Sequence, residues 1–330
     1  MRVIFMGTPD FAVSTAEALA EAGHEIALAV TQPDKPKGRG NKMQFPPVKE
    51  WAMEKGIPVF QPARIRAAEA VETLRDYAPD IIVVAAFGQI LPEEILKLPP
   101  YGCVNVHASL LPKYRGAAPI QWAVINGDKV SGVTTMQMGV GLDDGDMLLK
   151  REVELAEDET GGSLFDKLAK AGGELCVETL EALEKKTVTP EPQNEAEATH
   201  VGMIKKSLGR MDFSRSAEEL ERLVRGLNPW PSAFTRLEDK TLKIWKAAVR
   251  AELPENSAQG AKADLRAAAV LAEHPTPGMI CRMNEEGIWV LTGRDYLLLQ
   301  EIQMEGKKRM SAADFLRGHQ IVLGTVLGEK

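Results

Sequence analysis

The sequence predicts an α/β protein in which an open, mostly parallel β-sheet with covering helices is followed by a smaller β-barrel domain. Three observations support this prediction. Strand-like and helix-like patterns alternate over roughly the first 190 residues, a Pro- and Glu-rich segment then interrupts the apolar pattern, and several short strand-like runs follow it. The chain has 330 residues, which is enough for two domains of ordinary size.

In the first part, short apolar runs alternate with segments whose apolar residues recur at helical spacing. The predicted strands are Arg2–Phe5, His24–Thr31, Ile81–Ala86, Cys103–His107 and Gly132–Met138. The predicted helices are Phe11–Ala22, Pro47–Lys55, Ala67–Tyr77, Pro92–Leu98, Ala118–Asn126 and Gly162–Lys185. The run IIVVAA at 81–86 has no polar position, which is typical of a strand buried on both faces of a parallel sheet. Ligands of such sheets bind at the carboxyl ends of the strands, so we expect the site there.

The second part follows TVTPEPQNEAE at 187–197, which has no apolar period and is typical of a linker. Ala217–Gly226 is a predicted helix, and NPWPSAF at 228–234 predicts a rigid turn. The predicted strands are Thr241–Val249, Ala267–Leu271, Gly278–Met283, Gly287–Thr292 and Tyr296–Ile302. Short strands of this kind favour a small barrel. We therefore expect a first domain at 1–188, a linker at 189–206 and a second domain at 207–330.

The formal charge of −7 does not indicate a nucleic-acid-binding protein, but the charge is unevenly divided. Residues 1–204 carry 20 Lys and Arg against 30 Asp and Glu, and residues 205–330 carry 20 against 17, so the net charges are −10 and +3. The three cysteines are far apart and odd in number, which argues against a disulfide framework or a zinc knuckle. The sequence has no signal-peptide pattern and no apolar run of about 18 residues. We therefore expect a monomeric, cytoplasmic protein without membrane contact.

One segment of the first part is basic. Residues 34–49, DKPKGRGNKMQFPPVK, carry one Asp against five basic side chains: Lys35, Lys37, Arg39, Lys42 and Lys49. A connection of this length without strand or helix signals is usually functional or disordered. From these residues alone, the segment is either an ordinary solvated loop or a flexible arm that binds a polyanion, with the basic second part beside it.

Asn105 and His107 lie at the end of a predicted strand. Residues two apart on a strand share a face, so an amide and an imidazole would lie side by side where the chain leaves the sheet. Such donors suit the oxyanion of an acyl transfer, and the imidazole can move a proton near neutral pH. A histidine that merely completes the core at a strand end is the structural alternative.

Three acidic residues, Asp143, Asp144 and Asp146, lie in the glycine-rich loop GVGLDDGDM after the neighbouring predicted strand. A carboxylate there could face His107, orient its ring and stabilise the imidazolium. The alternatives are that these acids only shape the turn or bind a cation. The spacing is not that of a calcium loop and no second histidine is nearby for zinc, so we expect no metal.

Two further segments would line the same crevice, AFGQILP at 86–92 and SLLP at 109–112. Loops at the carboxyl ends of strands present backbone groups to planar, polar ligands, and the Phe87 ring with nearby aliphatic side chains could enclose a flat ring system. Ordinary packing around a loop is the alternative. The turn after Arg2–Phe5 lacks the G-x-G-x-x-G spacing, and the chain has neither a Walker lysine motif nor a G-x-S-x-G elbow.

These residues together resemble the folate-dependent formyltransferases. The resemblance rests on Asn105-x-His107, SLLP at 109–112 and Asp143 in GLDDGD, and it extends to FMGTPDFA at 5–12, TQPDKPKGRG at 31–40, RGAAPIQWAVINGD at 115–128, LNPWPSAF at 227–234 and KIWKA at 243–247. Members of this family formylate a charged tRNA, an amino-sugar nucleotide or glycinamide ribonucleotide. The last group is short and typically has Pro after the His, where this chain has Ala108. The match is closest to the tRNA-acting members, and only residues 252–268 look like an inserted surface loop.

The resemblance implies a Rossmann-like formyltransferase domain, an OB-like tRNA-binding second domain, catalysis by Asn105, His107 and Asp143, and 10-formyltetrahydrofolate as the formyl donor. The acceptor would be the free α-amine of initiator methionyl-tRNA, contacted by Lys35, Lys37, Arg39 and Lys42. The folate would be contacted by Phe87, Gly88, Gln89, Ile90, Leu91, Pro92, Ser109, Leu110, Leu111 and Pro112. Neither the residues nor the resemblance decides which group accepts the amine proton, or how initiator and elongator tRNAs are told apart.

Overall fold

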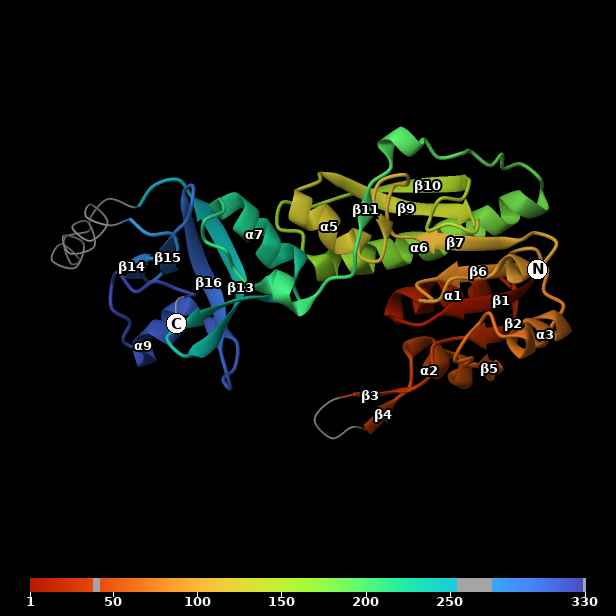
Figure 1. Cartoon of the computed structure of the whole chain (residues 1–330), viewed down its shortest axis with the longest axis horizontal. Helices are drawn as coiled ribbons and strands as arrows, with labels where there is room; N and C mark the ends of the chain where they lie inside the picture. Colours follow the sequence, from red (N-terminus) through yellow and green to blue (C-terminus); the bar gives the residue numbers. More distant parts are fainter. Residues whose placement is uncertain (38–41, 254–274, 329–330) are drawn as a thin grey trace. The chain divides into compact units, whose positions relative to one another are not determined.

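The computed structural model describes residues 1–37, 42–253 and 275–328 (Figure 1). The chain divides into two compact units, and the division is not a single cut in the sequence. The first unit holds Met1–Ile120, Lys129–Leu155 and Ser163–Gly202. The second holds Gln121–Asp128, Ala156–Gly162 and Met203–Lys330. Two short segments from the first half of the sequence therefore belong to the second unit.

A seven-stranded sheet forms the centre of the first unit. In spatial order its strands are β10 (Met147–Glu154), β9 (Val130–Gln137), β7 (Cys103–His107), β6 (Ile81–Ala85), β1 (Arg2–Gly7), β2 (Glu25–Val30) and β5 (Val59–Phe60). All pairings from β7 to β5 are parallel, whereas β9 is antiparallel to both of its neighbours. The chain runs outward from β1 through β2 to β5 and then returns to β6 and β7 on the other side. In sheets of this kind, ligands bind beyond the carboxyl ends of the strands at such a reversal.

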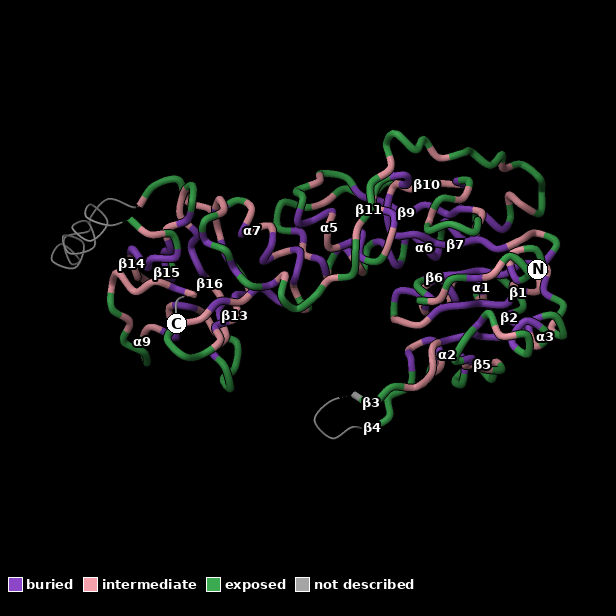
Figure 2. The backbone as a smooth tube through the Cα atoms, in the orientation of Figure 1, coloured by how far each residue is buried: buried purple, intermediate pink, exposed green. Residues whose placement is uncertain are grey.

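Helices cover both faces of this sheet. They are α1 (Asp10–Glu21), α2 (Pro47–Glu54), α3 (Ala68–Asp76), α4 (Glu93–Leu96) and α6 (Gly161–Glu184). Most of α5 (Pro119–Asn126) belongs to the second unit. On one face the rings of Phe11 in α1 and Phe165 in α6 meet edge to face at 5.8 Å. On the other face, residues of α3 and α4 share a buried core with Cys103 (Figure 2). Because side chains alternate along β7, Val106 packs towards α6, and Cys103, Asn105 and His107 share the opposite face.

The predicted strands and helices of the first unit are confirmed, with ends that shift by one or two residues. Three features differ from the predictions, and the first is that the two-residue strand β5 was not predicted. β10 is a strand that we did not predict, because half of the residues in its sequence MLLKREVE are charged. The basic segment contains a small hairpin of β3 (Lys35–Lys37) and β4 (Lys42–Gln44), so the expectation of a connection without strands is wrong.

The second unit is built around an antiparallel sheet, as the fold class predicts. Its strands, in spatial order, are β12 (Ala233–Leu237), β13 (Lys240–Arg250), β16 (Tyr296–Met304), β15 (Gly287–Leu291) and β14 (Ile280–Asn284), with β17 (Met310–Ser311) paired to β16. Helices α7 (Ala217–Gly226) and α9 (Ala312–Gly318) pack on it. α7 begins with a capping box in which Ser216 and Glu219 satisfy each other's backbone N–H. The predicted strand Ala267–Leu271 lies outside the described residues.

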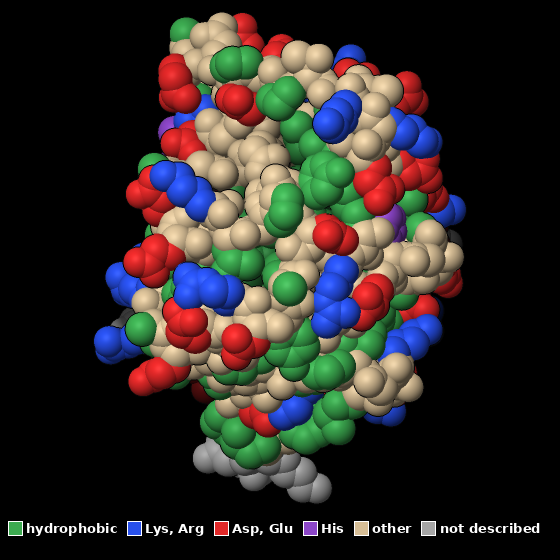
Figure 3. Space-filling view, turned by 90° about the vertical axis from the view of Figure 1, so that its right-hand side faces the viewer, with side chains coloured by type: hydrophobic (Ala, Val, Ile, Leu, Met, Phe, Trp, Pro, Cys, Tyr) green, Lys and Arg blue, Asp and Glu red, His purple; other side chains and the backbone are tan. Residues whose placement is uncertain are grey.

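On the face shown in Figure 3, acidic and basic side chains are interspersed, and the acidic excess of the first part does not gather into one patch there. Within the described ranges, no helix is both long enough and apolar enough to cross a membrane.

Candidate active site

β7 presents Asn105 and His107 towards its carboxyl end, next to β6. Asn105 lies opposite Val84 of β6 and His107 lies opposite Thr134 of β9. The two residues are 9% and 6% exposed, so both are almost enclosed by protein. His107 is the last residue of the strand, which places both polar side chains beside the loops that follow.

The His107 ring is held from both sides. Its Nε2 lies 2.9 Å from the carbonyl oxygen of Tyr114, and because a carbonyl only accepts, Nε2 carries the proton of that hydrogen bond. Its Nδ1 lies 3.6 Å from Oδ2 of Asp143. A second proton on Nδ1 would therefore point at a carboxylate, which is the arrangement that stabilises an imidazolium. Both ring nitrogens are thus occupied by the protein, a constraint that the sequence did not reveal.

Unlike the His107 ring, the Asn105 side chain has no hydrogen-bond partner among the described residues. No hydrogen bond joins its amide to another residue in the part of the chain that the structure describes, although the residue is only 9% exposed. The Asn105 amide atoms are not among the fully buried, unpartnered side-chain atoms of the described residues, so they reach solvent and their N–H groups are available to a ligand oxygen.

Asp143 is distinguished from the acidic residues next to it. Its Oδ2 accepts a hydrogen bond of 2.8 Å from the backbone N–H of Gly116 and also faces His107. Its backbone φ of 51° is in the left-handed region, which is unfavourable for a residue with a Cβ atom. Asp144 and Asp146 are exposed. The structure therefore brings one carboxylate of this loop to His107.

The segment Phe87–Pro92 follows β6 at the point where the strand order reverses. The Phe87 carbonyl accepts hydrogen bonds from Oγ1 of Thr8 and Nε2 of Gln32, but the Phe87 ring is buried in the core rather than open to a ligand. Leu91 is buried as well, Gly88 is exposed, and Ile90 is 75% exposed. Gln89 anchors the segment through its Oε1, which accepts from the N–H of Ile65, while Pro92 precedes α4. The open positions of this segment are thus Gly88 and Ile90.

The segment Ser109–Pro112 is tightly fixed. Ser109 is buried, its Oγ donates to the Lys113 carbonyl at 2.6 Å, and its own carbonyl accepts from Oγ1 of Thr134. The N–H of Leu111 donates to the same Thr134 hydroxyl oxygen at 3.1 Å, and a cis peptide bond joins Leu111 to Pro112. Leu110 is half-buried. These bonds give the segment a defined backbone path.

The basic side chains of residues 34–49 differ in their surroundings. Lys49, at the base, pairs with Asp34 at 2.7 Å and lies 3.9 Å from the centroid of the Phe45 ring. Lys35 is exposed on β3, and the backbones of Lys37 and Lys42 lie opposite each other in the hairpin. Arg39 lies outside the described residues. The one acidic residue of the segment is therefore paired with Lys49, which lies in α2.

The residues that hold the catalytic candidates in place were not predicted from the sequence. They are Tyr114 and Gly116, which act through backbone groups, and Arg115 and Gln193, which act through side chains. Backbone contacts leave no signal in a single sequence. Arg115 is 3% exposed, and a charged side chain so deeply buried is rare without a partner, but burial becomes visible only in the structure.

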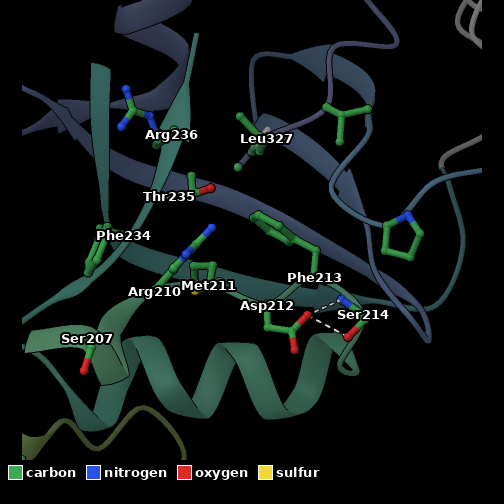
Figure 4. Close-up of a pocket in the computed structure, with 13 residues that line it drawn as sticks. Ser207, Arg210, Met211, Asp212, Phe213, Ser214, Phe234, Thr235, Arg236 and Leu327 are labelled. Atoms are coloured by element: carbon green, nitrogen blue, oxygen red, sulfur yellow. Dashed lines mark hydrogen bonds between the residues drawn. The ribbon is translucent and has the colours of Figure 1, made fainter. Parts of the chain in front are cut away.

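A cavity of about 660 Å³ lies in the second unit (Figure 4). Met211, Phe213 and Phe234 give it apolar walls, and Asp212 is tied to Ser214 at 2.6 Å rather than free. None of the predicted site residues lines this cavity. In the described part of the chain, no cluster of His, Cys, Asp or Glu could hold a metal ion.

Comparison with known proteins assigns the family. Residues 1–180 match the model of the formyl transferase family, and residues 203–320 match that of the formyl transferase C-terminal domain. This chain belongs to the formyl transferase family. The match leaves out residues 181–202, which include Gln193.

Full-length relatives in the family are similar throughout. The methionyl-tRNA formyltransferase of Agathobacter rectalis is 56% identical over 325 residues, covering 98% of this chain and 99% of that protein. The methionyl-tRNA formyltransferase of Lachnospira eligens is 54% identical over 329 residues and covers all of both chains. A solved N-formyltransferase from Helicobacter canadensis, in complex with folinic acid and dTDP-3-aminofucose, has a TM-score of 0.63 at 16% identity, covering 90% of this chain and 98% of that one. At this identity the likeness shows the fold alone.

Proposed function

We propose that this chain transfers the formyl group of 10-formyltetrahydrofolate to the free α-amine of initiator methionyl-tRNA, acting as a cytoplasmic monomer. The observation that carries the proposal is the pairing of His107 with Asp143 beside the unpartnered amide of Asn105. The full-length identity to proteins named methionyl-tRNA formyltransferase supports the choice of acceptor. The products would be N-formylmethionyl-tRNA and tetrahydrofolate.

The reaction needs an oxyanion to be stabilised. The amine nitrogen attacks the formyl carbon, the C=O electron pair moves to oxygen, and a tetrahedral intermediate forms. Asn105 donates to this oxygen from its enclosed position, where one such donor contributes about 3–4 kcal/mol to transition-state stabilisation. Collapse of the intermediate breaks the bond between carbon and N10 of the folate, and N10 takes up a proton.

The proton comes from the attacking amine, which is an ammonium after attack. His107 can carry it, because Asp143 compensates the charge of the imidazolium at 3.6 Å. Nε2 donates to the Tyr114 carbonyl in this structure. To take up the amine proton at Nε2, the ring must therefore leave the Tyr114 carbonyl and hold its own proton on Nδ1, which faces Asp143.

The folate would occupy the crevice between Gly88–Ile90 and Ser109–Pro112. Its flat ring would rest on backbone and aliphatic groups of these segments, because the Phe87 ring is buried. The tRNA would meet the basic hairpin, where Lys35 is exposed and Lys37 and Lys42 follow on the two strands. Arg39, at the tip in the sequence, would add a further phosphate contact.

The chemistry is tested with the variant Asn105→Ala. We expect kcat for formyl transfer to fall by roughly 100- to 1000-fold, the usual effect of removing one oxyanion donor, with an unchanged melting temperature. A fall of less than fivefold in a folded variant would remove Asn105 from the mechanism. If Asn105→Ala does not fold, Asn105→Asp is assayed instead, because Asp keeps the shape of the side chain but has no amide donor. The same fall in kcat is expected of it, and a fall of less than fivefold would again remove Asn105 from the mechanism.

A further inference from the structure

A segment that the sequence presents as a linker is part of the wall of the active site. We call residues 191–201 the strap. At its start, Glu191 and Met147 exchange two backbone hydrogen bonds of 2.8 Å just beyond the acidic loop. At its end, β11 (His200–Val201) pairs in parallel with β8 (Arg115–Gly116). The strap therefore joins the loop that carries Asp143 to the loop that follows His107, entirely within the first unit.

Gln193 makes the contact that matters most in the middle of the strap. Its Nε2 donates to the carbonyl oxygens of Asp143 and Gly145, both at 2.8 Å. These two carbonyls bracket the residue Asp144 and define the backbone path of the loop. Asp143 has a φ of 51°, a conformation that a residue with a Cβ atom leaves readily unless its surroundings hold it. Gln193 supplies two of the bonds that hold it.

Arg115 fixes Gln193 in turn. The Arg115 Nε donates to Oε1 of Gln193 at 3.0 Å, which leaves the Gln193 amide N–H groups directed at the acidic loop. The other two nitrogens of the guanidinium bind both carboxylate oxygens of Glu195 at 3.1 and 2.7 Å. The hydrogen bond from Arg115 lowers the pKa of Glu195, so this partner stays ionised at neutral pH. Arg115 is 3% exposed, and its five donors form a rigid fork.

The next residue completes the arrangement, since the N–H of Gly116 donates to the Asp143 side chain at 2.8 Å. The backbone of Asp143 is thus held through Gln193 and its carboxylate through Gly116, and both connections start from β8. We propose that Gln193, oriented by Arg115, is a positioning residue that keeps the Asp143 carboxylate against His107. This inference rests on the proposed function in one point, which is that Asp143 acts in the reaction.

The test is the variant Gln193→Glu, which has nearly the same shape but presents carboxylate oxygens to two carbonyl oxygens. We expect kcat to fall by roughly 10- to 100-fold, as small displacements of catalytic groups do, while KM for both substrates stays within about twofold. The matched control is Asn194→Ala, the next residue in the strap, whose side chain contacts Ala196 and Glu197 rather than the acidic loop. We expect it to retain the parent kcat. Equal kcat in parent and Gln193→Glu would overturn the proposal.

A double variant separates positioning from general damage. If Gln193 acts through Asp143, then Gln193→Glu should change kcat by less than about threefold in an Asp143→Asn background, because the group it positions is already lost. If the full effect of Gln193→Glu persists in that background, Gln193 does not act through Asp143 and the proposal is wrong. If Gln193→Glu fails to fold, Gln193→Ala is put through the same cycle.

The parent chain is assayed first, so that a failure of the proposed function can be distinguished from a failure of the positioning role of Gln193. A parent that transfers no formyl group to methionyl-tRNA contradicts the proposed function. In that case the cycle is run with the amino-sugar nucleotide acceptor, and the same kcat pattern decides the role of Gln193. A parent that is active, with Gln193→Glu equally active, contradicts the positioning role alone.

Discussion

Replacing Asp143 by Asn tests the contact between His107 and the acidic loop. Asn has nearly the same volume as Asp and keeps an oxygen that can accept from the N–H of Gly116, but it carries no charge. The hydrogen bond that Gln193 donates to the Asp143 carbonyl is also unaffected by the change. The variant therefore removes the charge opposite the imidazole and little else.

The size of the effect follows from the geometry. Nδ1 of His107 and Oδ2 of Asp143 are 3.6 Å apart, and their side chains are 7% and 15% exposed, so water screens them only in part. Two unit charges about 4 Å apart attract by roughly 4 kcal/mol at an effective dielectric constant of about 20. The imidazole gains only part of a charge in the transition state, so we expect a loss of about 2–3 kcal/mol, or roughly 30- to 160-fold in kcat.

The assay is steady-state formyl transfer at saturating donor, with KM determined for each substrate. KM should stay within about twofold, because the lost interaction strengthens only in the transition state. Asp144→Asn is the matched control, since Asp144 is exposed and should retain the parent kcat within about twofold. A kcat for Asp143→Asn within threefold of the parent, or an equal loss in Asp144→Asn, would refute the reasoning.

Three further predictions concern other parts of the chain. Lys35→Ala should weaken tRNA binding and reduce the slope of log K against log salt by about 0.7–0.9 if it neutralises one phosphate, which filter binding measures; an unchanged slope would count against the hairpin. Burial raises the pKa of Cys103 and Cys176 to about 12 and that of Cys281 to about 11, so a thiol reagent should label none of them at pH 8 until the chain unfolds; rapid labelling of the native chain would contradict this. The backbone and hydroxyl of Ser216 lower the pKa of Glu219 to about 2, so this carboxylate stabilises the fold above its unfolded pKa and stops doing so as pH falls towards 2. The melting temperature of Glu219→Gln should therefore lie below the parent at pH 7 and approach it below about pH 4, and a gap independent of pH would contradict the assignment.

The elements of the fold could be predicted because their signals are local. Strands such as Ile81–Ala85 are continuous apolar runs. The start of α7 is indicated by Ser216 followed three residues later by Glu219, which is the pattern of a capping box. β10 was not predicted, because an edge strand in which half of the residues are charged resembles a surface loop in a single sequence. The hairpin of β3 and β4 was not predicted, because its strands are three residues long and rich in Lys.

The candidate site was predictable only in its side chains. Asn105, His107 and the acidic loop could be placed at one edge by strand spacing and chain order. The family resemblance named Asp143 rather than Asp144, but the physical reason is a left-handed backbone and an N–H from Gly116, neither of which a sequence displays. Gln193 lies 50 residues from Asp143 in a segment without apolar pattern, so only the folded chain brings them together.

The most direct test of the account is formyl transfer from 10-formyltetrahydrofolate to methionyl-tRNA, with initiator and elongator tRNA compared side by side. The account predicts efficient transfer to the initiator, little transfer to the elongator, and release of one tetrahydrofolate for each formyl group transferred. Transfer to neither tRNA, with activity on an amino-sugar nucleotide instead, would keep the crevice and its chemistry but contradict the proposed acceptor.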